Sequence, residues 1–286
     1  MALAEELYSA KEINEDKTII NCLLTGGSGS GKTTAAAATA PGRKLVINVD
    51  NRVESIAGFK DVTILDAYEL DAGMPKAWDK LGKIKTWLWS QFRMAQKKGE
   101  KPPFDSIIVD GLTSMFDVAM NWSLLLSDKR GLGGSPAEQH WMPQMVAVEK
   151  WLLSVLALPC HIIVTAHEDI EEHRINGELF FLPKGTGKLR TKMPGWFNET
   201  FYAYRQKEKE SYGFFWRTQG EDKRDYLKSS INKLGSLWND PIRLDLDIDV
   251  VMGKKDSAKL QGFAWMLEQK ARHLAKGKEE KEGSQS

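Results

Sequence analysis

Cysteine and histidine are scarce in this sequence of 286 residues, which contains two cysteines and five histidines. Cys22 and Cys160 each lie in or beside an apolar run, so we expect buried thiols in a reducing compartment rather than a disulfide framework. A metal site built from cysteine and histidine is not expected, because these residues are too few and too scattered to surround an ion.

Long apolar runs and an excess of one charge are also missing. No run approaches the roughly 18 apolar residues that a membrane span requires. The N-terminus, MALAEELYSAKEINEDK, is acidic and amphipathic, whereas targeting segments are basic and apolar. With 40 basic and 39 acidic residues the formal net charge is +1, so any surface for a polyanion must be local. We therefore expect a globular cytoplasmic protein with no membrane partner.

Apolar runs of strand length alternate along the chain with stretches of helical period. Five runs, several of them apolar on both faces, are typical of buried strands: 18–25, 44–50, 61–66, 104–110 and 160–166. Between them, two stretches repeat apolar residues every three or four positions, at 81–95 and 145–155. This alternation predicts an α/β fold with a mostly parallel sheet flanked by helices.

The pattern changes after residue 168. Asn176-Gly177 lies between extended arms, which indicates a hairpin, and TFYAYR and GFFWRT read as a second antiparallel pair. We therefore expect an antiparallel C-terminal extension of the sheet. The expected segments are an N-terminal helical segment at 1–16, a main domain at 17–250 with a hairpin insertion at 169–197, and a C-terminal helix with a charged disordered tail at 251–286.

The sequence GGSGSGKTT follows the first strand and opens a helix-like run of alanines. In this context the pattern Gly26-x-x-x-x-Gly31-Lys32-Thr33 indicates a P-loop, in which glycines let backbone N–H groups turn toward phosphate oxygens. Lys32 would reach the β- and γ-phosphates, and the Thr33 hydroxyl would bind Mg²⁺. The residues expected to hold the nucleoside triphosphate are Gly26, Gly27, Ser28, Gly29, Ser30, Gly31, Lys32, Thr33 and Thr34.

A P-loop site also needs a carboxylate beside the magnesium ion, and the strand SIIVD ends in Asp110. Many ATP-hydrolysing proteins place a glutamate directly after this aspartate, where it orients the attacking water, but this chain has Gly111. The water-orienting acid must come from elsewhere, and we expect Asp50, at the end of KLVINVD, with Glu54 as second choice. Both aspartates could instead cap the helices that follow them.

Other P-loop classes fit the sequence less well. A guanine-reading Asn-Lys-x-Asp motif fails at its last position in 232–235, and the glycine-rich stretch at 131–135 is a poor match to the signature of transporter ATPases. An extra lysine early in the loop, as partition ATPases have, is replaced by Gly27 and Ser28. We therefore expect ATP with Mg²⁺.

The order of these parts resembles that of the RecA-like ATPases, and more narrowly the short phage-encoded AAA-type nucleotide-binding proteins grouped with RecA-like recombinases and single-strand annealing proteins. The resemblance covers residues 17–235 and rests on GGSGSGKTT, INVD, SIIVDGLTS, HIIVTAHED and GWFNETFYAYR. It implies a RecA-like P-loop fold, ATP hydrolysis and homo-oligomers, as rings or filaments. It also places Asp50 at the water-activating acid, which is usually Glu in the family, and His167 at the γ-phosphate sensor, which is commonly Gln.

In that family two loops contact single-stranded DNA, and the matching segments here are 127–141 and 169–195. Within the second, PKGTGKLRTKMPG at 183–195 is basic and lacks acids, and Trp196 and Phe197 just beyond it could stack on bases. Ordinary solvated loops and core aromatics are the alternative. The cations expected to contact DNA are Lys129, Arg130, Lys184, Lys188, Arg190 and Lys192.

The family also tends to complete its site with a cation from a neighbouring subunit. We expect Lys228 in this role, with Lys233 and Arg224 as competitors. The usual Lys-x-Arg pairing reads Lys228-Ser229-Ser230 here, which weakens the expectation of fast hydrolysis.

The sequence therefore predicts a Mg-ATPase, stimulated by single-stranded DNA, that serves recombination or annealing in a phage-infected or uninfected bacterium. A single-strand-binding or replication protein is a candidate further partner. Two alternatives stay open: an ATPase that remodels or loads a protein partner, as a helicase loader does, and a nucleotide-gated structural oligomer with little hydrolysis.

Overall fold

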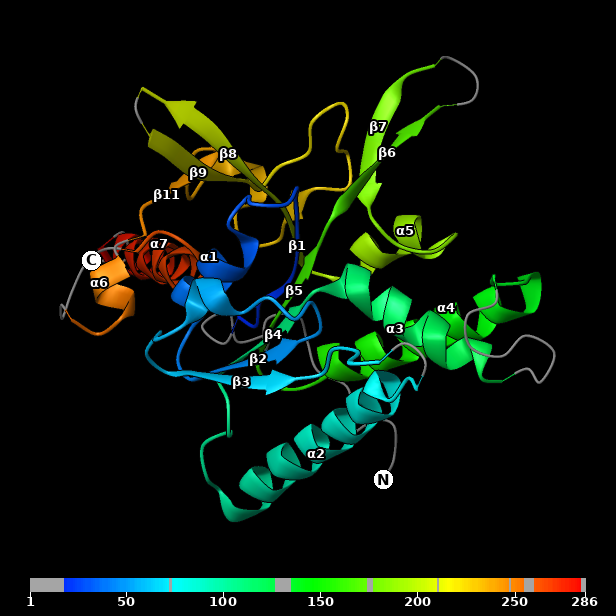
Figure 1. The fold of residues 1–286 in the computed structure, drawn as a ribbon. Coiled ribbons are helices and arrows are strands. Elements are labelled where there is room, and N and C mark those ends of the chain that lie inside the picture. Colours follow the sequence, from blue (N-terminus) through cyan, green and yellow to red (C-terminus); the bar gives the residue numbers. More distant parts are fainter. Residues whose placement is uncertain are drawn as a thin grey trace, which may run out of the picture.

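The computed structural model describes residues 18–71, 74–126, 135–173, 177–209, 211–246, 248–254 and 260–283. The expected N-terminal helical segment at 1–16 lies outside these residues. Figure 1 shows a central sheet with helices on both faces and two hairpins that project from one side.

In the described parts of the chain, nine strands form the central sheet, in the order β11-β9-β8-β1-β5-β4-β2-β3, with β10 beside β8. The strands are β1 (Asn21–Thr25), β2 (Lys44–Asn48), β3 (Val62–Asp66), β4 (Ser106–Asp110), β5 (His161–Ala166), β8 (Glu199–Glu208), β9 (Ser211–Arg217), β10 (Lys228–Ser229) and β11 (Ile242–Leu244). The neighbours from β3 to β8 are parallel, and β9, β10 and β11 pair antiparallel. The expected α/β fold, a mostly parallel sheet with an antiparallel C-terminal extension, is confirmed.

Helices cover both faces of the sheet. They are α1 (Lys32–Thr39), α2 (Ala77–Lys98), α3 (Leu112–Leu124), α4 (Glu138–Leu156), α5 (Leu189–Lys192), α6 (Ile248–Val251) and α7 (Phe263–Gly283), with short 3₁₀ turns η4 (Glu54–Ile56), η5 (Met193–Trp196) and η6 (Lys233–Gly235). Leu23 packs into the core cluster that contains side chains of α2, α3 and α4. Its neighbours Cys22 and Leu24 point to the opposite cluster, with α1 and α7. Side chains of a strand alternate between faces, which explains why the buried strands are apolar throughout.

The first five strands end at one edge of the sheet, and this edge carries the residues that the sequence singles out. The register sets Asn48 of β2 opposite Asp110 of β4, and Thr25 of β1 opposite Ala166 of β5. The segments after β1, β2, β4 and β5 therefore meet, although they are distant in sequence. Open parallel sheets bind ligands in the crevice outside these carboxyl ends.

The C-terminal half adds two hairpins. β6 (Glu168–Glu172) and β7 (Leu179–Pro183) form a separate two-stranded sheet, and β8 and β9 extend the central one. Asn176, which indicated the first turn, lies outside the described residues. β8 also pairs in parallel with β1, a contact that the sequence pattern did not reveal.

The last described helix, α7, begins with Phe263 in the core, where its ring packs 4.6 Å from that of Trp216. The helix continues to Gly283, so much of the segment expected to be a disordered tail is helical as far as it is described. Within the described chain, no helix combines the length and apolar character that crossing a bilayer requires.

Candidate active site

The glycine-rich loop between β1 and α1 forms one wall of a pocket of about 320 Å³ at the carboxyl edge of the sheet. Gly26 must be glycine, since its φ is 148° and an added Cβ would lie 2.2 Å from the carbonyl oxygen of Ala203 on β8. Gly29 and Gly31 have φ values of 72° and 80°, which L side chains rarely adopt. The loop thus turns sharply against the β8–β9 extension, with its backbone open to the pocket.

Lys32 lies at the start of α1 and is folded back onto the loop. Its Nζ donates hydrogen bonds to the carbonyl oxygens of Gly26 and Gly27, both at 2.8 Å. Burial lowers the pKa of Lys32 to about 8, although the nearby carboxylates of Asp110 and Asp50 oppose this shift. A phosphate in the pocket would give this ammonium group the counter-charge that it lacks.

Asp110, at the end of β4, receives two hydroxyl groups from neighbouring elements. Thr33 Oγ1 on α1 donates to both carboxylate oxygens, at 2.9 and 3.0 Å, and Thr165 Oγ1 on β5 donates at 2.6 Å. Burial raises the pKa of the Asp110 carboxyl, and these hydrogen bonds oppose the shift. A threonine hydroxyl beside a buried carboxylate is an oxygen donor set that suits Mg²⁺.

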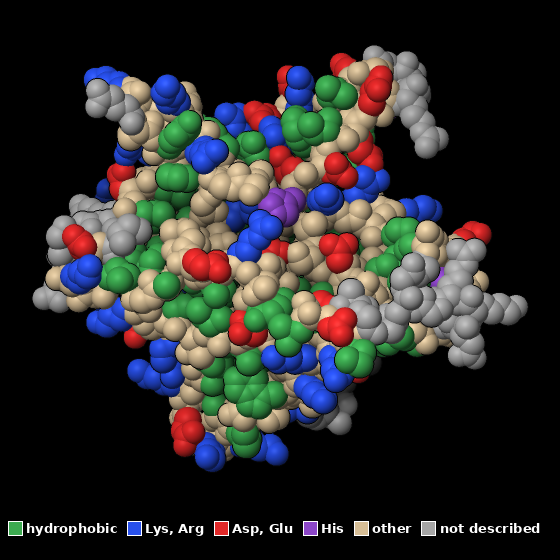
Figure 2. All heavy atoms as spheres, in the orientation of Figure 1, with side chains coloured by type: hydrophobic (Ala, Val, Ile, Leu, Met, Phe, Trp, Pro, Cys, Tyr) green, Lys and Arg blue, Asp and Glu red, His purple; other side chains and the backbone are tan. Residues whose placement is uncertain are grey.

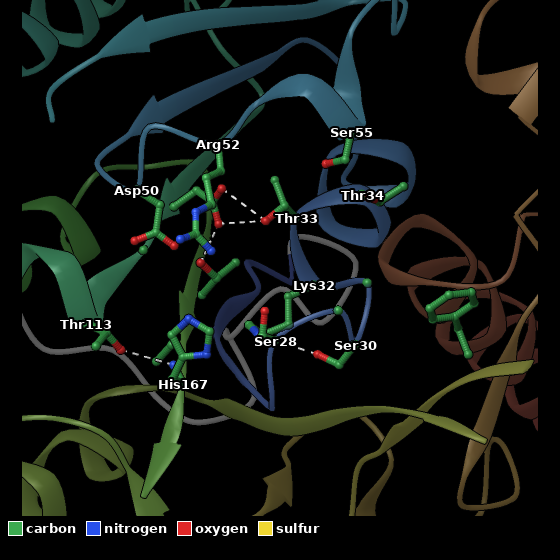
Figure 3. A pocket seen from close by; sticks show the side chains of 17 residues that line it. Ser28, Ser30, Lys32, Thr33, Thr34, Asp50, Arg52, Ser55, Thr113 and His167 are labelled. Carbon is green, nitrogen blue, oxygen red and sulfur yellow. Dashed lines mark hydrogen bonds between the residues drawn. The ribbon is translucent and has the colours of Figure 1, made fainter. Parts of the chain in front are cut away.

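Asp50 follows β2 and lines the same pocket (Figure 3). Ser114 Oγ, on the first turn of α3, donates a hydrogen bond to Asp50 Oδ1. An added Cβ at Gly111 would lie 2.8 Å from Asp50 Oδ2, so no side chain fits there while Asp50 keeps this position. The position of the Asp50 carboxylate therefore depends on residue 111 being a glycine. Glu54, the second choice, is exposed on η4 and does not line the pocket, whereas its neighbour Ser55 does.

His167 directly follows β5 and lines the same pocket, on the same side of the view as Asp50 (Figure 3). Its backbone N–H donates to Thr113 Oγ1 at 3.1 Å, which ties the end of β5 to α3. Burial and the charge of Lys32 lower the pKa of His167, while a hydrogen bond to the backbone of Gly26 opposes the shift. The imidazole thus lies beside both the P-loop and Lys32.

Several residues that line the pocket were not predicted. Arg52 lies beside Asp50, and an added Cβ at Gly31 would lie 3.0 Å from the ring of Phe214 on β9. The unpredicted lining residues are Arg52, Ser55, Thr113, Thr165, Ala166 and Phe214. Thr165 could have been found as a polar residue inside an apolar strand, whereas Phe214 reaches the site only through tertiary pairing.

Three cations were candidates for completing a neighbour's site. Lys228 on β10 and Lys233 on η6 are exposed and do not line the pocket of their own chain. Arg224 is held inside its own chain, since its guanidinium donates to both carboxylate oxygens of Glu168 and lies 3.8 Å from the ring centroid of Phe181. Arg224 is therefore not free to reach a neighbour, and Lys228 stays the candidate.

The segment 183–195 is compact rather than the flexible loop that its glycines suggested. It forms α5 and η5, with Leu189 and Met193 buried. Gly185 packs tightly, since an added Cβ would lie 2.9 Å from the ring of Phe116. Phe197 is only 2% exposed, which agrees with the alternative that it is a core aromatic and does not stack on bases. Trp196 is half-buried against the same core cluster.

The cations of this segment differ in their surroundings. Arg190 is paired with Glu171 and Asp169, and Lys192 is paired with Glu149. Lys184 and Lys188 are exposed. Lys129 and Arg130, the cations predicted on the other loop, lie outside the described residues.

A family model described as an AAA domain matches residues 18–229. No curated protein matches the sequence significantly. Among solved structures, a KaiC-like protein from the hyperthermophilic archaeon Pyrococcus horikoshii OT3 is 13% identical with a TM-score of 0.41, covering 80% of this chain and 86% of its own. The flagellar accessory protein FlaH from Methanocaldococcus jannaschii is 10% identical with a TM-score of 0.42, covering 80% and 85%.

Proposed function

Since the chain belongs to the AAA domain family, whose model matches residues 18–229, we propose that it is a Mg²⁺-dependent ATPase that acts on single-stranded DNA in recombination or annealing. The observation that carries the ATPase proposal is the meeting of three features in one pocket. These are the P-loop with Lys32, the hydrogen-bonded pair of Thr33 and Asp110, and the acid Asp50.

Each feature has a role in this proposal. The backbone N–H groups of the P-loop and the ammonium of Lys32 bind the phosphates, and Thr33 and Asp110 hold Mg²⁺. When bound there, Mg²⁺ would neutralise charge on the phosphate oxygens. Asp50, oriented by Ser114, accepts a hydrogen bond from a water and aligns it with the γ-phosphorus. A bond then forms from the water oxygen to phosphorus, the bond to the bridging oxygen of ADP breaks, and the proton that the water loses passes to an oxygen of the released phosphate.

Charge on the transferring group is balanced from several sides. Lys32 and the P-loop lie on one side, and Arg52 lines the pocket near Asp50. His167 contacts the γ-phosphate and senses its presence. Lys228 of a neighbouring copy completes the site in an oligomer. Positively charged groups held in place before the reaction stabilise the transition state more than they stabilise the ground state.

The ATPase proposal is tested with Lys32→Ala, measured by phosphate release with Mg-ATP. We expect turnover to be abolished, while the circular dichroism spectrum and melting temperature stay close to wild type because Lys32 contacts the loop and not the apolar core. Lys207→Ala, at an exposed position on β8, is the control and should hydrolyse normally. Wild-type turnover in a folded Lys32→Ala protein would exclude this pocket as the site.

The DNA part of the proposal is supported by the family resemblance and by the position of Lys184. Its backbone N–H donates to the carbonyl oxygen of His167 at 2.7 Å. Lys184, whose side chain is exposed, is therefore joined through its backbone to His167, the proposed sensor of the γ-phosphate. DNA bound there would contact the segment that leads into the pocket, which gives a route for stimulation of hydrolysis.

Replacing Lys184, Lys188, Arg190 and Lys192 with alanine tests this route. Hydrolysis should lose its stimulation by single-stranded DNA, and basal nucleotide binding should survive because none of these side chains lines the pocket. Stimulation equal to wild type would remove this segment from the proposal.

A protein-remodelling ATPase is the second candidate, and the β6–β7 hairpin favours it. This hairpin exposes Ile170 (58%) and Leu179 (51%) on the same face as Glu172, and this apolar and acidic surface suits a protein better than DNA. Turnover that is unaffected by DNA but stimulated by a replication protein would favour this reading.

A further inference from the structure

Helix α2 and its flanking residues carry an excess of basic over acidic residues that the rest of the chain lacks. Residues 76–101 contain eight lysines and arginines and two acids, while the whole chain has a formal net charge of +1. Lys76 and Lys80 lie at the N-terminal end of the helix, where the macrodipole disfavours positive charge. Helix stability therefore does not explain their placement.

One stripe of the helix carries four of these eight basic residues. Its residues recur every three or four positions, which places them on one face: Lys76, Lys80, Lys83, Trp87, Ser90, Met94 and Lys97. The buried face lies opposite and contains Leu81, Ile84, Leu88 and Phe92. The stripe thus has lysines at both ends and a tryptophan near its middle, and it contains no acid.

The lysines of this stripe are exposed and remain unpaired within the described part of the chain, whereas Arg190 and Lys192 of the 183–195 segment are in ion pairs. In Figure 2 the lower part of the molecule, where Figure 1 shows α2, carries basic side chains around hydrophobic ones. Unpaired cations in a row attract a linear polyanion and release its counterions when it binds.

A shallow groove of about 590 Å³ lies beside this stripe on α2, lined by Lys83, Trp87 and Ser90 of the stripe and by Asp79, Gly82 and Thr86 next to it. At Gly82 an added Cβ would meet nothing within 4 Å among the described residues, so the glycine leaves a notch in the helix surface. A glycine inside a helix costs about 1 kcal/mol relative to alanine, and no packing within the described part of the chain requires it here. Trp87 is 40% exposed beside this notch, with one side against Phe104 at 6.2 Å.

The helix is firmly attached to the body. Trp89 Nε1 donates to Ser154 on α4, and Trp151 Nε1 on α4 donates back to the carbonyl oxygen of Leu81 at 2.8 Å. These two bonds run in opposite directions between the helices and fix α2 in its rotation. The stripe is therefore presented on a rigid element, which lowers the entropy lost on binding.

We propose that the outer face of α2 binds single-stranded nucleic acid, with its lysines on the phosphate backbone and Trp87 stacked on a base beside the Gly82 notch. This inference rests on the proposed single-stranded substrate and gives that substrate a docking surface other than the 183–195 segment. Charge complementarity and an exposed aromatic are the two features of sequence-tolerant strand binding.

The test uses the full chain without nucleotide, titrated against a labelled oligothymidine at several salt concentrations. Replacing Lys76, Lys80, Lys83 and Lys97 with glutamine should weaken binding and lower the log–log salt slope by about 2 to 3, since each phosphate contact on a single strand contributes about 0.7. The quadruple alanine variant of Lys184, Lys188, Arg190 and Lys192 removes the same charge from the other proposed DNA surface and is the comparison. Lys207→Ala, at an exposed position on β8, is the control and should bind as the wild type does. Basal ATP hydrolysis of the α2 variant should be unchanged.

Gly82→Gln separates binding from folding. The substitution favours the helix and fills the notch, so the melting temperature should stay equal or rise while the affinity for the oligonucleotide falls. Trp87→Leu should lower the affinity roughly tenfold or more, through loss of stacking.

The outcomes distinguish this inference from the proposed function. If the wild type binds, and only the 183–195 variant loses affinity and slope, the α2 surface is wrong and the DNA-dependent function stands. If the wild type binds no oligonucleotide although it hydrolyses ATP, both the DNA substrate and this surface are overturned, and an acidic protein partner becomes the occupant to test.

Discussion

Gly111 and Asp50 compete for the same space, and this has a direct consequence for catalysis. An added Cβ at position 111 would lie within 2.9 Å of three atoms of the Asp50 carboxylate. We predict that Gly111→Ala displaces that carboxylate and lowers turnover toward the level of Asp50→Asn, about 10² to 10⁴-fold below wild type. Nucleotide affinity, measured with a fluorescent ATP analogue, should change little in both variants.

Asp110→Asn is the matched comparison. It removes the negative charge of the carboxylate that is proposed to hold Mg²⁺, so it should weaken magnesium-dependent nucleotide binding. Asp50→Asn should not weaken this binding. Normal hydrolysis by Asp50→Asn would make Arg52, Ser55 and Thr113 the next residues to test as positioners of the water.

Glu199 gives a prediction about pH away from the pocket. It is fully buried on β8, where Oε1 accepts hydrogen bonds from the backbone of Ser230 and Ile231. Oε2 has no hydrogen-bond partner among the described residues. Burial raises the pKa of this carboxyl above 4.5, its ordinary value. The folded state then binds the proton more tightly than the unfolded chain, so the contribution of Glu199 to stability is full in acid and is lost as the pH rises through the folded pKa.

Glu199→Gln keeps the acceptor oxygen and stays neutral at every pH. The difference in melting temperature, variant minus wild type, should therefore increase between pH 4.5 and pH 8, because effects of other groups cancel in the difference. A difference that stays constant over this range would show that folding does not raise the pKa of Glu199.

At the scale of elements, Arg224 joins the β6–β7 hairpin to the central sheet. Its guanidinium lies between the rings of Phe181 on β7 and Tyr202 on β8, at 3.8 and 3.7 Å from their centroids, and binds Glu168. Tyr226 OH also donates to Glu168 and lies 2.7 Å from Thr25 Oγ1, next to the P-loop. The hairpin and the loop that holds phosphate thus share one hydrogen-bonded cluster.

We predict that Arg224→Ala lowers the free energy of unfolding by about 3 kcal/mol, because it leaves Glu168 buried without its counter-charge. Arg243→Ala, which breaks an exposed ion pair with Glu208 at the other hairpin, is the control and should leave the urea midpoint nearly unchanged. Equal midpoints for the two variants would mean that the cluster does not stabilise the hairpin.

The elements differ in how far the sequence could predict them. The strands that carry Asp50, Asp110 and His167 were predictable, because parallel strands buried on both faces leave continuous apolar runs that end in polar residues. The compact segment at 183–195 was misread, because its lysines and glycines dominate the composition although Leu189 and Met193 lie four residues apart, as on one helix face. Phe214 was out of reach, since its place beside the P-loop depends on how β8 and β9 join the sheet.

At the scale of the whole molecule, Lys228 tests whether copies of the chain share active sites. It is exposed on β10, outside the pocket of its own chain. If it acts on a neighbour, Lys228→Ala and Lys32→Ala should each be inactive alone and partly active when mixed, because a Lys32→Ala subunit can still donate its intact Lys228. Native mass in the presence of ATP should show an oligomer. A mixture with no more activity than its parts would exclude Lys228 from this role.

The pairing of β1 with β8 has a consequence for the order of events at the ribosome. Asn21 and Asn198, joined by a hydrogen bond of 2.8 Å, are 177 residues apart, and at about 5 to 20 residues per second their synthesis is separated by roughly 10 to 35 s. Throughout that interval the edge of β1 that pairs with β8 stays open, and until β5 is made the other edge is open as well. Gly26 also lacks its contact with Ala203 of β8. The nascent chain therefore cannot complete its phosphate-binding loop until most of the protein has been made, and an unpaired apolar strand must be kept from associating with other chains until then.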